Sequence, residues 1–234
     1  MSKVNWRDQL RVIDIYITNQ CQAGCPSCSR FDMALAPFLL DHTKDYEDYP
    51  YKVAELLGMD HMPKEKVIRL LKNNVPRGLD YCIKFCGEFG DPLMHPHIFD
   101  LVKFVAKRQN NRVLLHTNGG LRNKDWWIEL AGVIERGDVV FSIDGTTAEV
   151  NNYYRKRVNF DRAMENMCAF ADNCYEGIAN WDYLVFDWNW HQIKEANDIA
   201  KAHNIGIDFK IQDRSYGLIS SENRRKALDI IHAL

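Results

Sequence analysis

The sequence contains no apolar run of about 18 residues, so a membrane-spanning helix is not expected. Its first residues, MSKVNWRDQLRV, also lack the apolar core of a secretory signal. A basic excess is missing too, because 30 Lys and Arg residues face 32 Asp and Glu residues. This balance argues against general nucleic-acid binding. We therefore expect a cytoplasmic protein that neither enters membranes nor binds polyanions in general.

The seven cysteines do not indicate a disulfide framework, because their number is odd and a chain of 234 residues does not need covalent staples. In a reducing compartment, cysteines are either inert core residues or ligands, and their positions decide which. Low-complexity tracts, repeats of fixed period and Pro/Ser-rich linkers are also missing from the sequence. We therefore expect a single domain over residues 1–234.

Short β-type runs alternate with helical runs along the chain. The expected strands are residues 12–18, 81–86, 112–117, 138–143, 181–186 and 207–211. The expected helices are residues 63–73, 96–108, 124–135, 160–172, 190–203 and 221–234. The strand–helix units thus run over about 12–213, with an insertion at about 30–62 and a C-terminal helix at about 221–234.

This alternation predicts an α/β fold in which parallel strands are joined by right-handed crossovers. Six such units could close partly into a barrel or stay an open sheet. In both cases the reactive site lies beyond the C-terminal ends of the strands. The insertion and the tail after the sixth strand are candidates for substrate contact.

Three cysteines stand close together directly after the first expected strand, in the run Cys21-Gln-Ala-Gly-Cys25-Pro-Ser-Cys28. Thiolates are soft ligands that suit zinc or iron–sulfur clusters, and these spacings let one loop surround a metal centre. Three interpretations compete. The cysteines could be unrelated core residues, or they could bind zinc with His42 or His61 as the fourth ligand. They could also hold a [4Fe–4S] cluster that leaves one iron without a protein ligand.

With this loop after the first of six βα units, the sequence resembles the radical S-adenosylmethionine (radical SAM) superfamily over about residues 12–212. The resemblance implies a partial (βα)6 TIM-like barrel of parallel strands with outer helices. It also implies two cofactors: a [4Fe–4S] cluster held by Cys21, Cys25 and Cys28, and S-adenosyl-L-methionine bound to the open iron. No cysteine-rich extension follows the sixth strand, so a single cluster is expected.

The resemblance further implies the reaction. The cluster would reductively cleave S-adenosylmethionine to a 5′-deoxyadenosyl radical, which abstracts hydrogen from a small-molecule, nucleoside or peptide substrate. A flavodoxin- or ferredoxin-type partner would donate the electron. The sequence identifies neither the substrate nor a residue that takes part in the hydrogen transfer.

The segment after the second strand, Cys86-Gly-Glu-Phe-Gly-Asp-Pro92, resembles the family's Gly-Gly-Glu-Pro segment. By this resemblance Gly87 and Glu88 bind the cofactor, and Glu88 takes its ammonium group. Asp91 is the alternative acid, and an ordinary Gly-Asp-Pro turn is the alternative interpretation. One departure from the family is Ser27, since that position is often aromatic.

The ends of the third and fourth strands also resemble the family. Thr117 and Asn118 open a Thr-Asn-Gly segment, and Ser142 and Asp144 form a Ser-x-Asp ending. The resemblance implies that all four residues bind the cofactor. Both segments could instead be plain Asn-Gly and Asp-Gly turns.

Two further residues resemble cofactor ligands of the family. Arg155 could clamp an anionic group, although a solvated charge run is the alternative. Asn189 could contact the cofactor, although with Gln192 it could also form a capping box. Two other protein classes stay open: a zinc- or cluster-stabilised non-catalytic binding module, and a degenerate relative that acts as an interaction protein.

Overall fold

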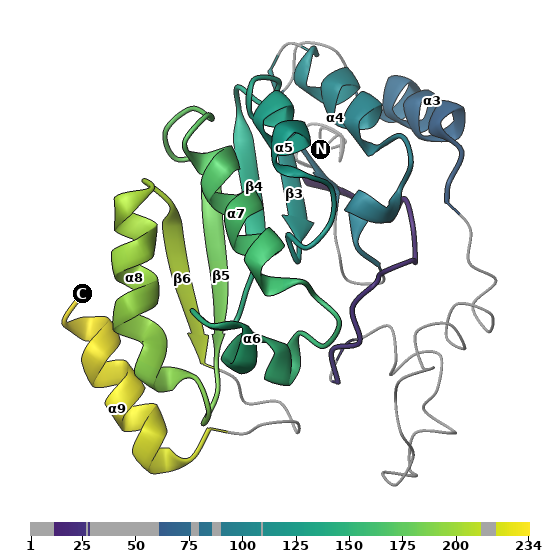
Figure 1. Ribbon diagram of the computed structural model, residues 1–234. Coiled ribbons are helices and arrows are strands. Elements are labelled where there is room, and N and C mark those ends of the chain that lie inside the picture. The colour runs from purple at the N-terminus through teal and green to yellow at the C-terminus, as the bar shows by residue number, and fades with distance from the viewer. Residues whose placement is uncertain are drawn as a thin grey trace, which may run out of the picture.

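Six parallel strands form one sheet in the computed structural model (Figure 1). The structure describes residues 12–26, 28, 61–75, 80–85, 90–108, 110–211 and 219–234. The strands are β1 (Val12–Ile15), β2 (Tyr81–Phe85), β3 (Asn111–Thr117), β4 (Gly137–Ser142), β5 (Ala179–Val185) and β6 (Gly206–Ile211). Each strand pairs with the next one in the sequence. Among the described residues β1 and β6 are the two edges of the sheet, and the predicted α/β fold of six parallel strands is confirmed.

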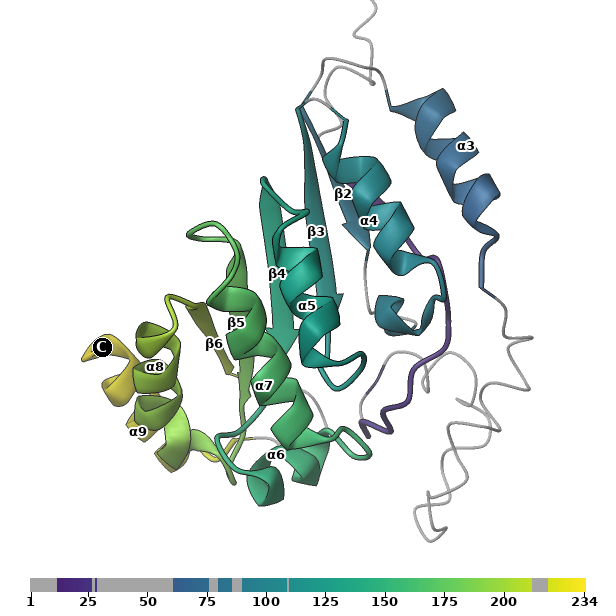
Figure 2. The same ribbon diagram turned by 45° about the horizontal axis from the view of Figure 1, so that its top comes forward.

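Helices follow the strands in the expected alternation. They are α3 (Lys64–Asn74), α4 (Ile98–Ala106), α5 (Lys124–Ala131), α6 (Ala148–Tyr154), α7 (Phe160–Ala171), α8 (Ile193–Ala202) and α9 (Ser221–His232), with short 3-10 helices η3 (Pro92–Met94) and η4 (Trp190–Gln192). Side-chain caps define several starts: Asn123, Asn159 and Ser220 each accept a backbone hydrogen bond at the first turn of α5, α7 and α9. Figure 2 shows α4, α5 and α7 on the same face of the sheet.

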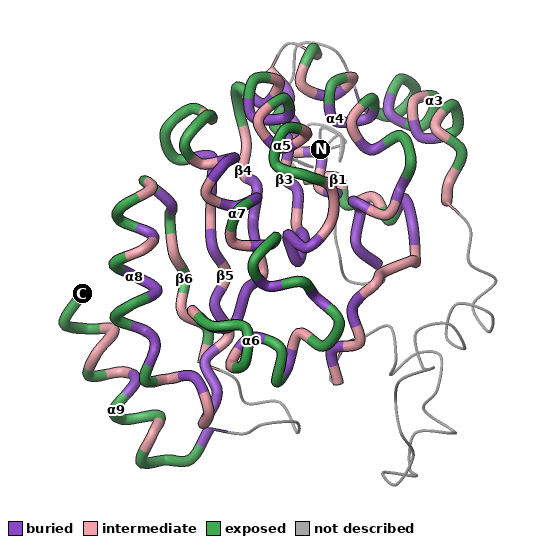
Figure 3. Tube along the Cα trace, in the orientation of Figure 1, coloured by how far each residue is buried: buried purple, intermediate pink, exposed green. Residues whose placement is uncertain are grey.

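The face of the sheet under these helices is apolar. Side chains alternate between the two faces of a strand, and buried residues alternate with partly exposed ones along β5 (Figure 3). Fully buried members of the helix-covered face include Ile83, Leu115, Phe141 and Trp181. This layer between sheet and helices holds the ends of the strands in register.

The opposite face, called the inner face below, carries polar residues, most of them charged, at alternate positions: Asp14, Lys84, His116, Asp182 and Lys210. Its two shortest ion pairs join neighbouring strands. Lys84 Nζ is 2.9 Å from Asp14 Oδ2, and Lys210 Nζ is 2.5 Å from Asp182 Oδ2. The inner face is therefore polar, in contrast to the helix-covered face.

Several elements differ from their expected boundaries; α5, for example, ends at Ala131 and not at residue 135. The first strand ends at Ile15, because the chain then turns away and Thr18 forms an antiparallel bridge with His61. Helix α6 was not expected; it starts where the Thr147 hydroxyl accepts a hydrogen bond from the Val150 amide. The helix expected over 190–203 begins as the 3-10 turn η4 before α8.

Two expected regions lie partly or wholly outside the described residues. Of the insertion expected at about 30–62, only residues 61 and 62 are described, and residues 212–218 before α9 are not described. In the part of the chain that the structure does describe, no helix is long and apolar enough to cross a membrane.

Candidate metal centre and cofactor site

The cysteine loop starts shortly after β1, at the C-terminal edge of the sheet, and neighbouring segments hold it by its backbone. The Asp91 amide, just after β2, donates to the Gln20 carbonyl at 2.8 Å, and the Gly24 amide donates to the Lys156 carbonyl at 2.9 Å. A methyl group on Gly90 would lie about 2.6 Å from the Thr18 carbonyl oxygen, so only glycine allows this close approach. The edge of the sheet thus fixes where the loop begins.

The three sulfur atoms have different surroundings. Cys21 Sγ accepts hydrogen bonds from the Ala23 amide at 3.4 Å and from Asn118 Nδ2 at 3.7 Å. Cys25 is buried, and Cys28 is partly exposed. Burial raises the pKa of the Cys25 thiol to about 11, and the nearby Arg155 guanidinium, which also hydrogen-bonds to the thiol, opposes this rise. Cys25 is therefore a neutral thiol at neutral pH until a metal replaces its proton.

Asp91 is buried behind the loop, and with its hydrogen-bond donors Leu93, Thr117 and Asn118 it forms a network called the hub below. Its carboxylate accepts hydrogen bonds from the Leu93 amide (2.9 Å), the Thr117 hydroxyl (2.9 Å), the Asn118 amide (2.9 Å) and Asn118 Nδ2 (2.6 Å). Burial raises the pKa of Asp91, and these hydrogen bonds oppose the rise. Both carboxylate oxygens are engaged by protein donors, so the hub joins the ends of β2 and β3.

Thr117 and Asn118 are turned toward this hub in the described structure. Asn118 Oδ1 accepts from Gln22 Nε2 at 2.7 Å and from the Gly120 amide at 3.0 Å. Side chains that the sequence assigned to the cofactor thus contact Asp91 and the cysteine loop. Their roles in binding the cofactor stay predictions.

Asp144 and Arg155 form a buried ion pair after β4. The Asp144 side chain is fully buried; its Oδ2 is 2.6 Å from Arg155 Nε, and its Oδ1 accepts from the Leu184 amide at 2.9 Å. Burial raises the pKa of Asp144, and the guanidinium opposes the rise. The Arg155 side chain is only 15% exposed, so the interpretation of Arg155 as a solvated charge is wrong.

Asn189 and Ser142 are two further predicted site residues near the C-terminal ends of β4 and β5. Asn189 is fully buried: its Oδ1 accepts from the Phe186 amide at 2.7 Å, and its Nδ2 donates to the carbonyls of Leu184 (2.8 Å) and Asp144 (3.0 Å). The capping-box interpretation is wrong, because the Asn189 side chain makes no cap hydrogen bond to η4. Ser142 is partly exposed and lies beside Asp182 on the inner face.

Gly87 and Glu88 lie outside the described residues, as do Cys86 and Ser27. The predicted role of Glu88 at the cofactor ammonium therefore stays a prediction. The engagement of both Asp91 oxygens argues against Asp91 as the alternative acid.

Asn166 is a site-supporting residue that the sequence did not assign. It is fully buried on α7, and its Nδ2 donates to the carbonyls of Gly119 (2.8 Å) and Leu121 (3.1 Å). It lies on the apolar face of α7 with Ala163, Met167 and Phe170. The sequence does contain a signal for this role: Asn166 is a single polar residue on an apolar helix face, and a buried amide needs hydrogen-bond partners.

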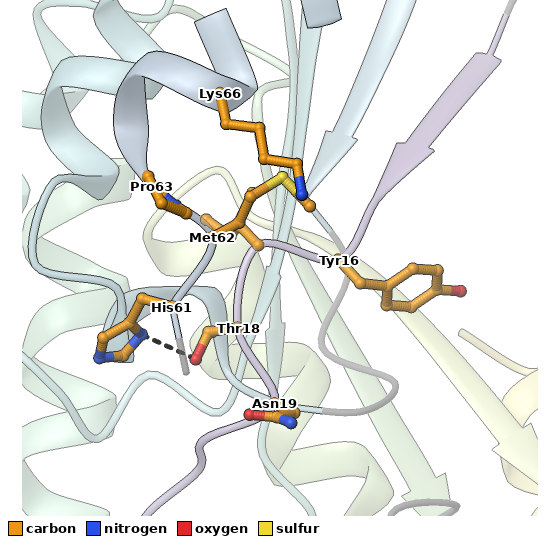
Figure 4. Close-up of a pocket in the computed structure, with 8 residues that line it drawn as sticks. Tyr16, Thr18, Asn19, His61, Met62, Pro63 and Lys66 are labelled. Atoms are coloured by element: carbon orange, nitrogen blue, oxygen red, sulfur yellow. Dashed lines mark hydrogen bonds between the residues drawn. The ribbon is translucent and has the colours of Figure 1, made fainter. Parts of the chain in front are cut away.

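A side pocket of about 440 Å³ lies between the end of β1 and the start of α3 (Figure 4). Its lining residues are Tyr16, Ile17, Thr18, Asn19, His61, Met62, Pro63 and Lys66. His61 Nδ1 lies 2.9 Å from Thr18 Oγ1 at its wall. None of the three loop cysteines lines it, so this pocket does not mark the metal centre.

The donor set fits a [4Fe–4S] cluster in kind and number. Three thiols stand on one loop, and one of them already accepts two N–H hydrogen bonds, the surroundings of a thiolate ligand. Across the described residues, no three His, Cys, Asp or Glu side chains are gathered closely enough to hold a metal ion. That absence concerns a single metal ion, whereas the cysteines of a [4Fe–4S] cluster bind different iron atoms and need not lie so close together.

Comparison with known proteins relates this architecture to one family. A family model described as the radical SAM superfamily matches residues 15–200. No curated protein matches the chain by sequence.

Solved structures also match the fold. Native anSMEcpe with bound AdoMet gives a TM-score of 0.65 at 18% identity, covering 96% of this chain and 59% of that one. SuiB from Streptococcus suis bound to S-adenosylmethionine gives 0.60 at 15% identity, covering 95% and 47%. SuiB bound to the precursor peptide SuiA gives 0.59 at 16% identity, covering 96% and 46%.

The chain thus spans about half of the length of SuiB, and 59% of anSMEcpe. At these identities the structural matches establish the fold, whereas the family model covers most of the chain. Its members are enzymes that use a [4Fe–4S] cluster and S-adenosylmethionine and need a reductant. The chain belongs to the radical SAM superfamily.

Proposed function

We propose that this chain binds a [4Fe–4S] cluster through Cys21, Cys25 and Cys28 and catalyses hydrogen abstraction from a polar substrate. The observation that carries the proposal is the three-cysteine loop at the C-terminal edge of a parallel six-stranded sheet. When bound, the cofactors supply the one-electron cleavage of S-adenosylmethionine that yields methionine and a 5′-deoxyadenosyl radical.

The residues around the loop prepare the thiols for the metal. Cys25 must lose its proton, and Arg155 favours the resulting thiolate by charge and hydrogen bonding. Asp144 holds the guanidinium in place through the ion pair at 2.6 Å. Cys21 accepts N–H hydrogen bonds from the Ala23 amide and from Asn118 Nδ2, which favour its thiolate form.

The cofactor would lie between the cysteine loop and the strand ends. Gly87 and Glu88 are proposed to meet its ammonium group. Ser142, partly exposed at the end of β4, offers a hydroxyl on the inner face. Thr117, Asn118, Asp144 and Asn189 are engaged with protein partners, so we assign them to shaping the edge of the sheet.

The inner face favours a polar substrate: a small molecule, a nucleoside or a peptide segment. Lys84 and Asp182 belong to two of its ion pairs, and their charges shift the pKa of His116 on the central strand β3 in opposite directions. Burial lowers the pKa of His116, and Lys84 adds to this effect, so its ring is neutral at pH 7. Covering these charges with an apolar molecule would remove them from water at a large free-energy cost.

The reaction needs an electron donor, and a flavodoxin- or ferredoxin-type protein fits the low potentials of cysteine-ligated clusters. We also propose that the chain is one domain that works in a reducing, cytoplasmic setting. All six described cysteines are free thiols.

The test is anaerobic incubation of the cluster-loaded protein with a reductant and S-adenosylmethionine, followed by chromatography for 5′-deoxyadenosine. We expect the product from the wild type and none from Cys25→Ala. Cys82→Ala is the matched control, because Cys82 lies on β2 outside the loop; it should keep both iron and product. A protein that binds zinc instead of iron and sulfide, or equal product from Cys25→Ala, would contradict the proposal.

A further inference from the structure

We propose that Asn118 is a positioning residue that sets the reduction potential of the cluster, by donating an amide hydrogen bond to the sulfur of Cys21. The inference rests on the proposed function, since it requires that Cys21 be a cluster ligand. Asn118 stands at the end of β3, far from Cys21 in sequence, and the fold brings their side chains together.

The amide group of Asn118 has only one possible orientation. Its Nδ2 carries two hydrogens: one points to Asp91 Oδ2 at 2.6 Å, and the other faces Cys21 Sγ at 3.7 Å and Gln22 Oε1 at 3.4 Å. Turning the amide over would place its oxygen against the Asp91 carboxylate. It would also break the bond that Oδ1 accepts from Gln22 Nε2 at 2.7 Å. The donor is therefore held toward the sulfur.

The surroundings keep this donor in place. Asn118 is 6% exposed and Asp91 is 3% exposed, so water does not compete freely for the amide. The Asp91 amide also binds the Gln20 carbonyl, directly before Cys21. Asp91 thus holds both the Asn118 donor and Gln20 at the start of the cysteine loop.

A hydrogen bond to a ligand sulfur acts on the electron that the cluster accepts. Reduction adds negative charge to the cluster and its thiolates, and an N–H dipole stabilises that charge more than it stabilises the oxidised form. A buried, low-dielectric setting strengthens the effect. Asn118 should therefore raise the reduction potential, which makes the cluster easier to reduce.

The experiment compares two variants of the same hub. Asn118→Ala removes the donor to sulfur, whereas Thr117→Val removes a hydrogen bond to Asp91 without touching Cys21. The readouts are iron content and the midpoint potential from an EPR-monitored redox titration of the cluster-loaded protein. We expect a more negative potential in Asn118→Ala and an unchanged potential in Thr117→Val.

An unchanged potential in Asn118→Ala overturns the inference, and so does an equal shift in both variants, because that result would reflect a loosened hub. If Asn118→Ala does not fold, pulsed EPR of the wild type labelled with ¹⁵N in asparagine replaces it. A nitrogen coupling to the reduced cluster supports the inference, and its absence overturns it. A wild type without a four-iron cluster contradicts the proposed function instead, so the two failures are distinguishable.

Discussion

Asp91 and Asp144 are two buried aspartates at the same edge of the sheet, and they are stabilised in opposite ways. Among the described residues, the hydrogen-bond donors to Asp91, after β2, are all neutral, whereas Asp144, after β4, pairs with the Arg155 guanidinium. Each aspartate orients the group that contacts a different cysteine. Asp91 orients the Asn118 amide at Cys21, and Asp144 orients the Arg155 guanidinium at Cys25.

The difference shows two ways to tune a thiolate. The neutral hydrogen bonds around Asp91 fix the direction in which the Asn118 amide donates, because that amide has one orientation. The ion pair of Asp144 and Arg155 instead keeps a positive charge next to the Cys25 thiol, because arginine does not lose its proton in proteins. Burial raises the pKa of Asp144, and the charge and hydrogen bond of Arg155 oppose this rise.

The largest effect that tests this comparison is expected for Asp144→Ala. The substitution leaves the Arg155 charge buried without a counter-ion and should lower the free energy of unfolding by about 3–5 kcal/mol. Urea unfolding of the metal-free protein measures it. The double variant Asp144→Leu/Arg155→Leu is the control and should be far more stable than Asp144→Ala. Equal stabilities of the two would show that the pair is not acting as a buried ion pair.

A smaller loss is expected for Asp91→Ala, because no charge is stranded. The substitution leaves the donors of Thr117, Asn118 and Leu93 without their acceptor and should cost about 1–3 kcal/mol in the same urea experiment. Asp91→Asn, which keeps one acceptor oxygen, should lose less. A loss larger than that of Asp144→Ala would reverse the comparison.

The third test uses pH and concerns the thiol of Cys25, which the Arg155 guanidinium contacts. Burial raises the pKa of the Cys25 thiol to about 11, so between pH 7 and 9 its thiolate fraction rises about tenfold per pH unit. Anaerobic cluster assembly, followed by the rise of iron–sulfur absorbance, should accelerate over this range. Because Arg155 lowers the pKa of Cys25, Arg155→Gln should assemble more slowly than the wild type at pH 8. A rate independent of pH in the wild type would argue against this origin.

Much of the fold could be predicted, because its signals are local. All six strands were predicted, since alternating apolar runs separated by amphipathic segments indicate parallel βα units. Helix α6 was not predicted, because its sequence has little apolar periodicity. Of its seven residues only Asn151 and Tyr154 are buried. The end of β1 was placed too late, because the bridge between Thr18 and His61 depends on a segment distant in sequence.

The candidate site was predictable in position but not in side-chain partners. Thr117, Asn118, Asp144 and Asn189 do stand near strand ends, as expected. Many of their hydrogen bonds, however, go to protein groups that are distant along the chain, up to 97 residues away for the contact between Asn118 and Cys21. Residue spacing does not specify such partners, so the sequence alone could not separate a cofactor ligand from a residue that shapes the edge.

By itself, the sequence determined that three thiols share one loop and that this loop follows the first of six βα units. Both facts depend only on residue order and on the periodicity of apolar side chains. Only the tertiary structure decided that a neutral amide faces Cys21 while a guanidinium faces Cys25. The reason is physical: a buried carboxylate needs donors, and the packing of neighbouring strand ends determines which side chains are within reach.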